Sequence, residues 1–289
     1  MINTNDFRVK GGKKKKISLK DFDTSYDGPL TKKEVNNHLL PANQQAMKDW
    51  QERLYAENEQ ALLIVLQAMD AAGKDGIIKK VFTAMNPQGV QVTPFKVPTR
   101  NEEDHEYLWR VNLALPRRGN IGIFNRSHYE EVLVTRVHDL LEESQMPDHL
   151  IDENIWQRRF KEIRHFEKYL GNNGIKVIKF FLHVSKEEQQ ERLLERIDRP
   201  EKNWKFASSD VLERERWDDY QCAYEELLAA TSTKEAPWYV IPADRKWYTR
   251  YVVSQLVVET FEEMNPQYPK LPKEELDHLD HWREVLLNS

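Results

Sequence analysis

The chain has 289 residues, enough for one large domain with a sizeable hydrophobic core. Its 48 acidic and 43 basic residues give a net charge of −5, which argues against a general nucleic-acid binder, because such proteins are usually basic overall. A single cysteine, Cys222, excludes an internal disulfide and fits a reducing compartment, and no apolar run approaches the roughly 20 residues that a membrane helix needs. We therefore expect a cytoplasmic protein whose partners include neither nucleic acid nor a membrane.

The first 40 residues are polar, and we predict an irregular N-terminal segment there. It contains four consecutive lysines, Lys13–Lys16. They either bind a polyanion or form a solvated tail, and we favour the tail. Residues 41–289 are predicted to form one domain, which begins with a helix after Pro41. The apolar residues of this helix recur every three or four positions, as one buried face requires, and they are Met47, Trp50, Leu54 and Tyr55.

The rest of the chain alternates between short apolar runs and stretches with a helical apolar period. The apolar runs suit strands of a parallel sheet buried on both faces, and they are 62–66, 90–97, 121–125, 177–184 and 238–241. The helical stretches are 74–85, 102–115, 130–142, 152–172, 186–197, 208–230, 246–263 and 273–287. This alternation predicts parallel βαβ units and therefore an α/β fold, a three-layer α/β/α sandwich.

The most informative segment is Ala68-Met69-Asp70-Ala71-Ala72-Gly73-Lys74-Asp75-Gly76, between the first predicted strand and a helix. A phosphate-binding P-loop needs this context, because backbone N–H groups and the helix dipole then face one anion. We predict that Lys74 supplies a mobile cation and that the loop binds phosphate through Ala71, Ala72, Gly73, Asp75 and Gly76. The match to G-x-x-x-x-G-K-[ST] is imperfect at Ala68 and Asp75. The alternative is therefore an ordinary Gly-Lys turn.

The second predicted strand end next to this loop is Ile121-Gly122-Ile123-Phe124-Asn125, followed by Arg126. A phosphate loop usually has a partner strand that ends in Asp, which positions the metal, but this strand ends in Asn125. An arginine at such a strand end faces the ligand crevice of an open α/β sheet. We therefore predict that Arg126 clamps a phosphate, and that His128 has a structural role.

A third segment, residues 192–205, is rich in arginine and lysine, and Pro200 ends a helix within it. Mobile basic loops of this kind close over phosphates and exclude water. We predict a lid at about residues 192–215. The alternative is an ordinary charged surface.

These three segments together resemble the family-2 polyphosphate kinases. The resemblance rests on Asp70-x-x-Gly73-Lys74, on Phe124-Asn125-Arg126-Ser127-His128-Tyr129-Glu130 and on Arg196-Ile197-Asp198-Arg199-Pro200-Glu201-Lys202-Asn203-Trp204-Lys205. It is closest to the subgroup that phosphorylates both nucleoside mono- and diphosphates, and it covers the chain from about Leu19 to the C-terminal helices. It implies a thymidylate-kinase-like P-loop fold with a helical lid, a homo-oligomer, and Mg²⁺ as cofactor, with Mn²⁺ as a substitute.

The resemblance also implies roles for single residues. Asp70 matches the loop Asp that contacts Mg²⁺ and the acceptor phosphate, and Lys74 matches the loop Lys. Arg126 and Arg196 match the arginines of the second strand end and of the lid. Asn125 stands where many members have a Walker B Asp, and Glu130 stands where the diphosphate-specific subgroup has Asn; both differences suit the subgroup named above. Ala68 departs even from the subgroup, and it leaves the loop geometry open because Ala resists positive φ.

The function predicted is Mg²⁺-dependent, reversible phosphoryl transfer between inorganic polyphosphate and nucleotides, from AMP to ADP to ATP. Adenine nucleotides are the expected acceptors, with guanine nucleotides as a further candidate. Since Asn125 offers no carboxylate, we expect Glu130 to hold Mg²⁺ together with Asp70. The cations expected to bind the polymer are Lys79, Lys80, Arg117 and Arg118. The alternatives are an ATP-dependent nucleoside monophosphate kinase and a non-catalytic nucleotide-binding protein.

Overall fold

The architecture was analysed in a computed structural model that describes residues 2–11, 16–141 and 144–289. Lys13–Lys15 of the lysine run and residue 142 of one predicted helix lie outside the described residues. Five parallel strands form one sheet in the order β2-β3-β1-β4-β5. The strands are β1 (Ala61–Ala68), β2 (Val90–Pro94), β3 (Ile121–Asn125), β4 (Ile175–His183) and β5 (Trp238–Pro242). The predicted parallel α/β sheet is confirmed.

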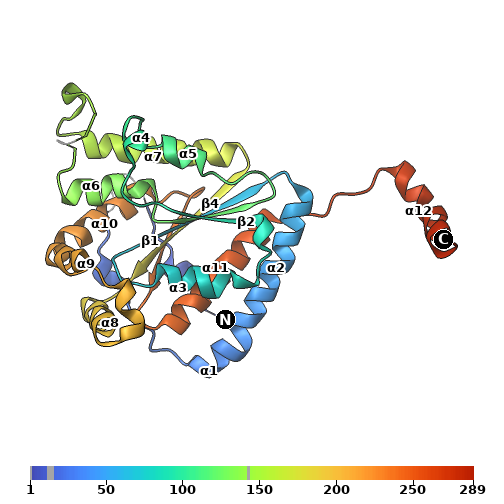
Figure 1. Cartoon of the computed structure of the whole chain (residues 1–289), viewed down its shortest axis with the longest axis horizontal. Coiled ribbons are helices and arrows are strands. Elements are labelled where there is room, and N and C mark those ends of the chain that lie inside the picture. Colours follow the sequence, from blue (N-terminus) through green and yellow to red (C-terminus); the bar gives the residue numbers. More distant parts are fainter. Residues whose placement is uncertain (1, 12–15, 142–143) are drawn as a thin grey trace.

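Helices cover both faces of the sheet (Figure 1). The α-helices are α1 (Lys32–Glu34), α2 (Leu40–Glu57), α3 (Lys74–Val81), α4 (Arg100–Glu103), α5 (Trp109–Leu113), α6 (Val134–Val137), α7 (Ile155–Asn172), α8 (Lys186–Asp198), α9 (Ser208–Glu213), α10 (Trp217–Thr231), α11 (Lys246–Met264) and α12 (Lys273–Leu287). One layer contains α2, α3 and α11, in which α11 packs against both α2 and α3, and the other contains α6, α7 and α10. The central strand β1 is buried along its whole length because it lies between β3 and β4.

Two predicted elements differ from the structure in burial. The strand predicted at 90–97 ends at Pro94, and it is not buried on both faces, because β2 lies at the sheet edge and leaves 42% of Val92 exposed. In α2, Tyr55 was expected on the buried face but is 50% exposed. Gln51 is buried in this helix instead, because its amide exchanges two 2.7 Å hydrogen bonds with the backbone of Asn86.

Some predicted helices are interrupted. The stretch predicted at 102–115 forms two short helices, α4 and α5, and Thr99 caps the first of them through a reciprocal pair of bonds with Glu102. The stretch predicted at 208–230 is divided by a 3-10 turn, Arg214–Arg216, between α9 and α10. The last helix, α12, stands away from the sheet, and none of its residues is buried (Figure 1). No helix among the described residues combines the length and the apolar character that a membrane span requires.

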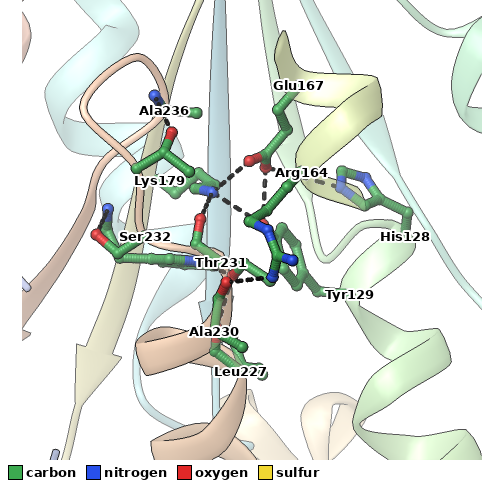
Figure 2. A network of polar contacts seen from close by, with 12 residues as sticks. His128, Tyr129, Arg164, Glu167, Lys179, Leu227, Ala230, Thr231, Ser232 and Ala236 are labelled. Carbon is green, nitrogen blue, oxygen red and sulfur yellow. Dashed lines mark hydrogen bonds and ion pairs between the residues drawn. The ribbon is translucent and has the colours of Figure 1, made fainter. Parts of the chain in front are cut away.

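The core between the sheet and α7 contains a buried charge cluster, here called the Lys179 cluster and formed by Lys179, Glu167, Tyr129 and Thr231 (Figure 2). The Lys179 ammonium donates to Glu167 Oε2 at 2.6 Å, to the Tyr129 hydroxyl at 2.9 Å and to the Thr231 carbonyl at 2.9 Å. The Tyr129 hydroxyl in turn donates to Glu167 Oε1 at 2.7 Å. His128 packs beside Tyr129, and its burial lowers its pKa to about 3, so it is a neutral core residue. The cluster ties the segment that follows Arg126 to β4 and α7.

Candidate active site

The predicted phosphate loop connects β1 to α3 at the carboxyl edge of the sheet. Ala68 is the last residue of β1, so it has no need of the positive φ that an alanine resists. The left-handed positions are instead Ala71, with φ of 60°, and Gly73, with φ of 113°. Gly73 meets this requirement at little cost, whereas Ala71 is strained. The departure at Ala68 therefore leaves the turn of the loop intact.

The end of β3 lies beside the loop because β3 is the parallel neighbour of β1, with Leu66 opposite Asn125. Asn125 Nδ2 donates to Asp75 Oδ1 at 2.9 Å. Arg126 has a left-handed backbone with φ of 65°, and its guanidinium donates to Asp70 Oδ1 at 2.7 Å. The two sequence segments predicted to handle phosphate are thus joined by an amide–carboxylate bond and an ion pair.

The charged side chains of the site shift one another's pKa values. Burial lowers the pKa of Lys74, and the nearby charge of Arg126 acts in the same direction. Burial also opposes the charge on Arg126, but Glu130 and Asp70 raise its pKa overall. Burial raises the pKa of Glu130 against the opposing effects of Arg126 and Lys74. Four of the predicted site residues therefore influence one another directly.

A cleft of about 530 Å³ opens over the loop and the end of β3. Its walls also include α8, the 3-10 helix Pro200–Lys205, α9 and the first turns of α11. Among the predicted residues, the cleft brings together Asp70, Ala71, Ala72, Gly73, Lys74, Asp75, Gly76, Asn125, Arg126 and Arg196. Glu130 is not part of this lining, but its charge acts on Lys74 and Arg126.

Arg196 reaches the cleft from α8, where its Nη1 donates to Asp210 Oδ2 at 2.6 Å. The sequence alone does not single out Asp210, because an acid near a helix start is ordinary. Burial raises the pKa of Asp210, and the charge of Asp70, which lines the same cleft, acts in the same direction.

Two cations of the cleft were also missed, Lys246 and Arg250, whereas Lys202 and Lys205 belong to the basic segment predicted as a lid. Burial lowers the pKa of Lys246, with a further effect from Arg192, and burial alone lowers the pKa of Arg250. Both residues belong to α11, which the sequence predicted only as a helix after the sheet. Lys246 and Arg250 lie one turn apart at the start of α11, and this spacing was the sequence feature that could have indicated a basic surface there.

The cations predicted to bind the polymer lie elsewhere. Lys79 and Lys80 are exposed on the second half of α3, outside the cleft lining. Arg117 and Arg118 precede β3, and Arg118 donates to the Glu59 carbonyl just before β1. They therefore lie at the amino edge of the sheet, opposite the loop, and the structure does not bring them together with Lys74.

A divalent cation fits the donors of this cleft. Among the described residues, no three His, Cys, Asp or Glu side chains are grouped as a metal site. Mg²⁺ does not need such a group in a phosphotransferase, because it usually keeps waters and binds one or two carboxylates together with substrate phosphates. Asp70 in the cleft wall and Glu130, whose carboxyl is within the electrostatic influence of Lys74 and Arg126, offer carboxylates of this kind.

Comparisons with known proteins agree with this geometry. A family model described as Polyphosphate kinase 2 (PPK2) matches residues 30–269. The chain is 46% identical over 288 residues to a Rhodopseudomonas palustris protein named ADP-polyphosphate phosphotransferase, covering 99% of each chain. It is also 46% identical over 259 residues to a Meiothermus ruber protein named AMP/ADP-polyphosphate phosphotransferase, covering 88% of this chain and 92% of the relative. The crystal structure of polyphosphate kinase 2 from Arthrobacter aurescens superposes with a TM-score of 0.86 at 38% identity, covering 98% of this chain and 95% of that one.

Proposed function

Since the chain belongs to the polyphosphate kinase 2 family, we propose that it is a polyphosphate:nucleotide phosphotransferase that converts AMP to ADP and ADP to ATP, reversibly and with Mg²⁺. The observation that carries this proposal is the meeting of Asp70, Lys74 and Arg126 at one sheet edge, with Arg196 of α8 in the same cleft. The names of the relatives favour this activity over an ATP-dependent monophosphate kinase and over a non-catalytic protein.

The cleft supplies positioning and charge, which is what phosphoryl transfer requires of a protein. Backbone N–H groups of Ala71–Gly76 and the Lys74 ammonium would hold the phosphates. Arg126 and Arg196 would neutralise the oxygens of the transferring group from two sides, and the part of the predicted 192–215 segment that follows Arg192 would act as the lid. Asp70 and Glu130 would hold Mg²⁺, which shields the phosphate charge when bound.

Polyphosphate is a long polyanion and needs more cations than one loop offers. We propose that it runs from Lys74 across the start of α11, where Lys246 and Arg250 line the cleft. Lys79 and Lys80 on α3 extend this basic surface outside the cleft. Arg117 and Arg118 would touch only a polymer segment that wraps around to the opposite edge of the sheet.

We also propose a homo-oligomer. The helix α12 carries exposed apolar side chains on one face, namely Leu276, Leu279, Trp282 and Leu286. A 15-residue helix is only marginally stable alone in water. The segment before it contains three prolines, which stiffen it and hold α12 away from its own chain. A second copy is therefore the partner we propose, and light scattering of Leu279→Glu should show a smaller particle than the wild type.

One assay tests the activity. Purified protein is incubated with Mg²⁺ and AMP or ADP, with either polyphosphate or ATP as donor; guanine nucleotides serve as a second acceptor set. Polyphosphate should support formation of ADP and ATP. Transfer from ATP to AMP alone would indicate a monophosphate kinase, and no transfer from either donor would indicate a binding protein.

A further inference from the structure

The helix α8 contacts three consecutive carbonyls of the phosphate loop. Gln189 Nε2 donates to the Asp70 carbonyl at 3.0 Å. One turn later, Arg192 Nη1 donates to the Ala71 carbonyl at 3.1 Å and to the Ala72 carbonyl at 2.7 Å. The loop backbone is thus held from one side by a single helix face.

The remaining donors of Arg192 are also occupied. Nε donates to Glu188 Oε1 at 2.7 Å, and Nη2 donates to the carbonyls of Ala243 at 2.7 Å and Asp244 at 3.1 Å. A guanidinium has five N–H donors and no acceptor, so all its hydrogen-bonding capacity is used. The side chain is only 6% exposed. Although Arg192 lines the cleft, it has no donor left for a phosphate.

The contacts of Arg192 fall where the loop is strained. Ala71 has φ of 60°, a left-handed conformation that is unfavourable for a residue with a Cβ atom. Strain of this kind persists only where the surroundings over-determine the conformation. Because a trans peptide points its C=O and the next N–H in opposite directions, fixing the Ala72 carbonyl also fixes the N–H of Gly73 away from the guanidinium.

We propose that Arg192 is the positioning residue of the phosphate loop, tying its strained turn to α8 and to the turn between β5 and α11. This inference rests on the proposed function, because the loop is the phosphate site. Arg192 is one helical turn before Arg196, so the same helix that presents the lid arginine also sets the loop beneath it. Arg192 itself touches neither substrate nor metal.

The test compares Arg192→Lys with Arg164→Lys. Lysine keeps the charge but cannot bridge five acceptors. Arg164 donates to the Ala230 carbonyl from α7, on the other layer of the fold (Figure 2). Two readouts are measured: hydrogen exchange of a peptide spanning residues 69–76, and steady-state kinetics with polyphosphate and ADP.

In Arg192→Lys, exchange in the loop should rise at least about 10-fold while β1 stays protected, and turnover should fall about 10- to 100-fold, because small misplacements of reacting groups are costly. Arg164→Lys should change neither. Unchanged loop exchange in Arg192→Lys would overturn the inference even if the wild type proved inactive. A wild type without phosphoryl transfer would instead overturn the proposed function, and the exchange result would still decide the role of Arg192.

A third measurement separates positioning from phosphate binding. The salt dependence of polyphosphate affinity reports how many cations the polymer neutralises. For Arg192→Met the log–log slope should equal that of the wild type. A shallower slope would make Arg192 a polymer ligand and overturn the inference.

Discussion

Two lysines, Lys74 half-buried and Lys179 fully buried, show how differently one fold can use the same side chain. Burial lowers the pKa of both Lys74 in the phosphate loop and Lys179 in the core. Lys179 donates to three acceptors, which is all an ammonium can do. Among the residues that the structure describes, Lys74 donates one hydrogen bond, to the Ala68 carbonyl at 2.9 Å. Lys179, with all three donors bonded, is a structural residue, whereas Lys74 keeps N–H donors for a ligand.

The carboxylates near the two lysines differ in the same way. Glu167 lies 2.6 Å from Lys179 and compensates it locally. Asp70, Glu130 and Asp75 all favour the charged form of Lys74, but Asp70 is bonded to Arg126 and Asp75 to Asn125. The carboxylates near Lys74 are therefore bound to other side chains, and none of them neutralises Lys74 alone. A site with surplus positive charge suits a polyanion, while a locally neutral pair suits a core.

The largest effect that this contrast predicts is on stability. Lys179→Met should lower the free energy of unfolding by about 3–5 kcal/mol, because it leaves the Glu167 carboxylate buried and unpaired. Urea denaturation measures this. The double variant Lys179→Met/Glu167→Leu should recover much of the loss, since it removes both charges. Equal loss in single and double variants would mean that packing, not charge, is what the pair contributes.

Lys74→Ala should have the reverse pattern: a large effect on activity and a small one on stability. Turnover should fall about 100-fold or more, because the loop loses the cation that contacts phosphate, while the unfolding free energy changes by less than about 1 kcal/mol. Asp70→Ala should behave in the same way. Steady-state kinetics and urea denaturation on the same preparations check both points, and near-normal turnover in either variant would contradict the site assignment.

The sequence predicted Lys74 and its loop because the signal is local: an apolar strand, a Gly-Lys turn and a helix. It did not predict Asp210 or Arg250, because chain topology brings them to the cleft from distant helices. Arg117 and Arg118 were predicted to bind the polymer because they are close in sequence to the second strand of the site. They precede β3, however, so they lie at the amino edge of the sheet, opposite the loop. The sequence did not predict the Lys179 cluster either, because the partners of a lysine within an apolar strand come from distant segments that only the fold brings together.

Arg196→Ala tests whether the lid side of the cleft acts on the reaction or only on binding. An arginine that contacts the transferring group should lower turnover about 10- to 100-fold and affect nucleotide affinity little. Kinetics combined with equilibrium titration of nucleotide separate the two effects. A higher Michaelis constant with unchanged turnover would make Arg196 a binding residue.

The two edges of the sheet should differ in their effect on the polymer. Polyphosphate affinity should fall with salt on a log–log plot, because cations are displaced from the polyanion on binding. Lys246→Ala and Arg250→Ala should each weaken binding several-fold and make the slope shallower. Arg117→Ala and Arg118→Ala should leave both unchanged. A flat response of the wild type, or equal effects at both edges, would contradict the proposed path across α11.

The smallest effect concerns Glu130, which lies between the Lys179 cluster and the site around Lys74. It follows Tyr129 of the Lys179 cluster within the 3-10 helix His128–Val132, and its charge acts on Lys74 and Arg126. A monophosphate acceptor offers the metal fewer oxygens than a diphosphate, so its reaction should depend more on a protein carboxylate. Glu130→Asn should therefore slow phosphorylation of AMP several-fold more than that of ADP.

The pH profile gives an independent readout of Glu130. Burial raises the pKa of its carboxyl, so the carboxylate is lost at a higher pH than the usual 4.5, and the AMP reaction of the wild type should fall as pH drops through that raised value. Glu130→Asn should lack this acidic limb. Glu131→Asn is the matched control, because burial raises the pKa of Glu131 too, but its carboxylate pairs with Arg159 at 3.6 Å, outside the cleft lining. If Glu130→Asn slowed the AMP and ADP reactions equally, Glu130 would be a general metal ligand or a helix-start acid. Only a carboxylate that compensates for the shorter acceptor should affect the AMP reaction more than the ADP reaction.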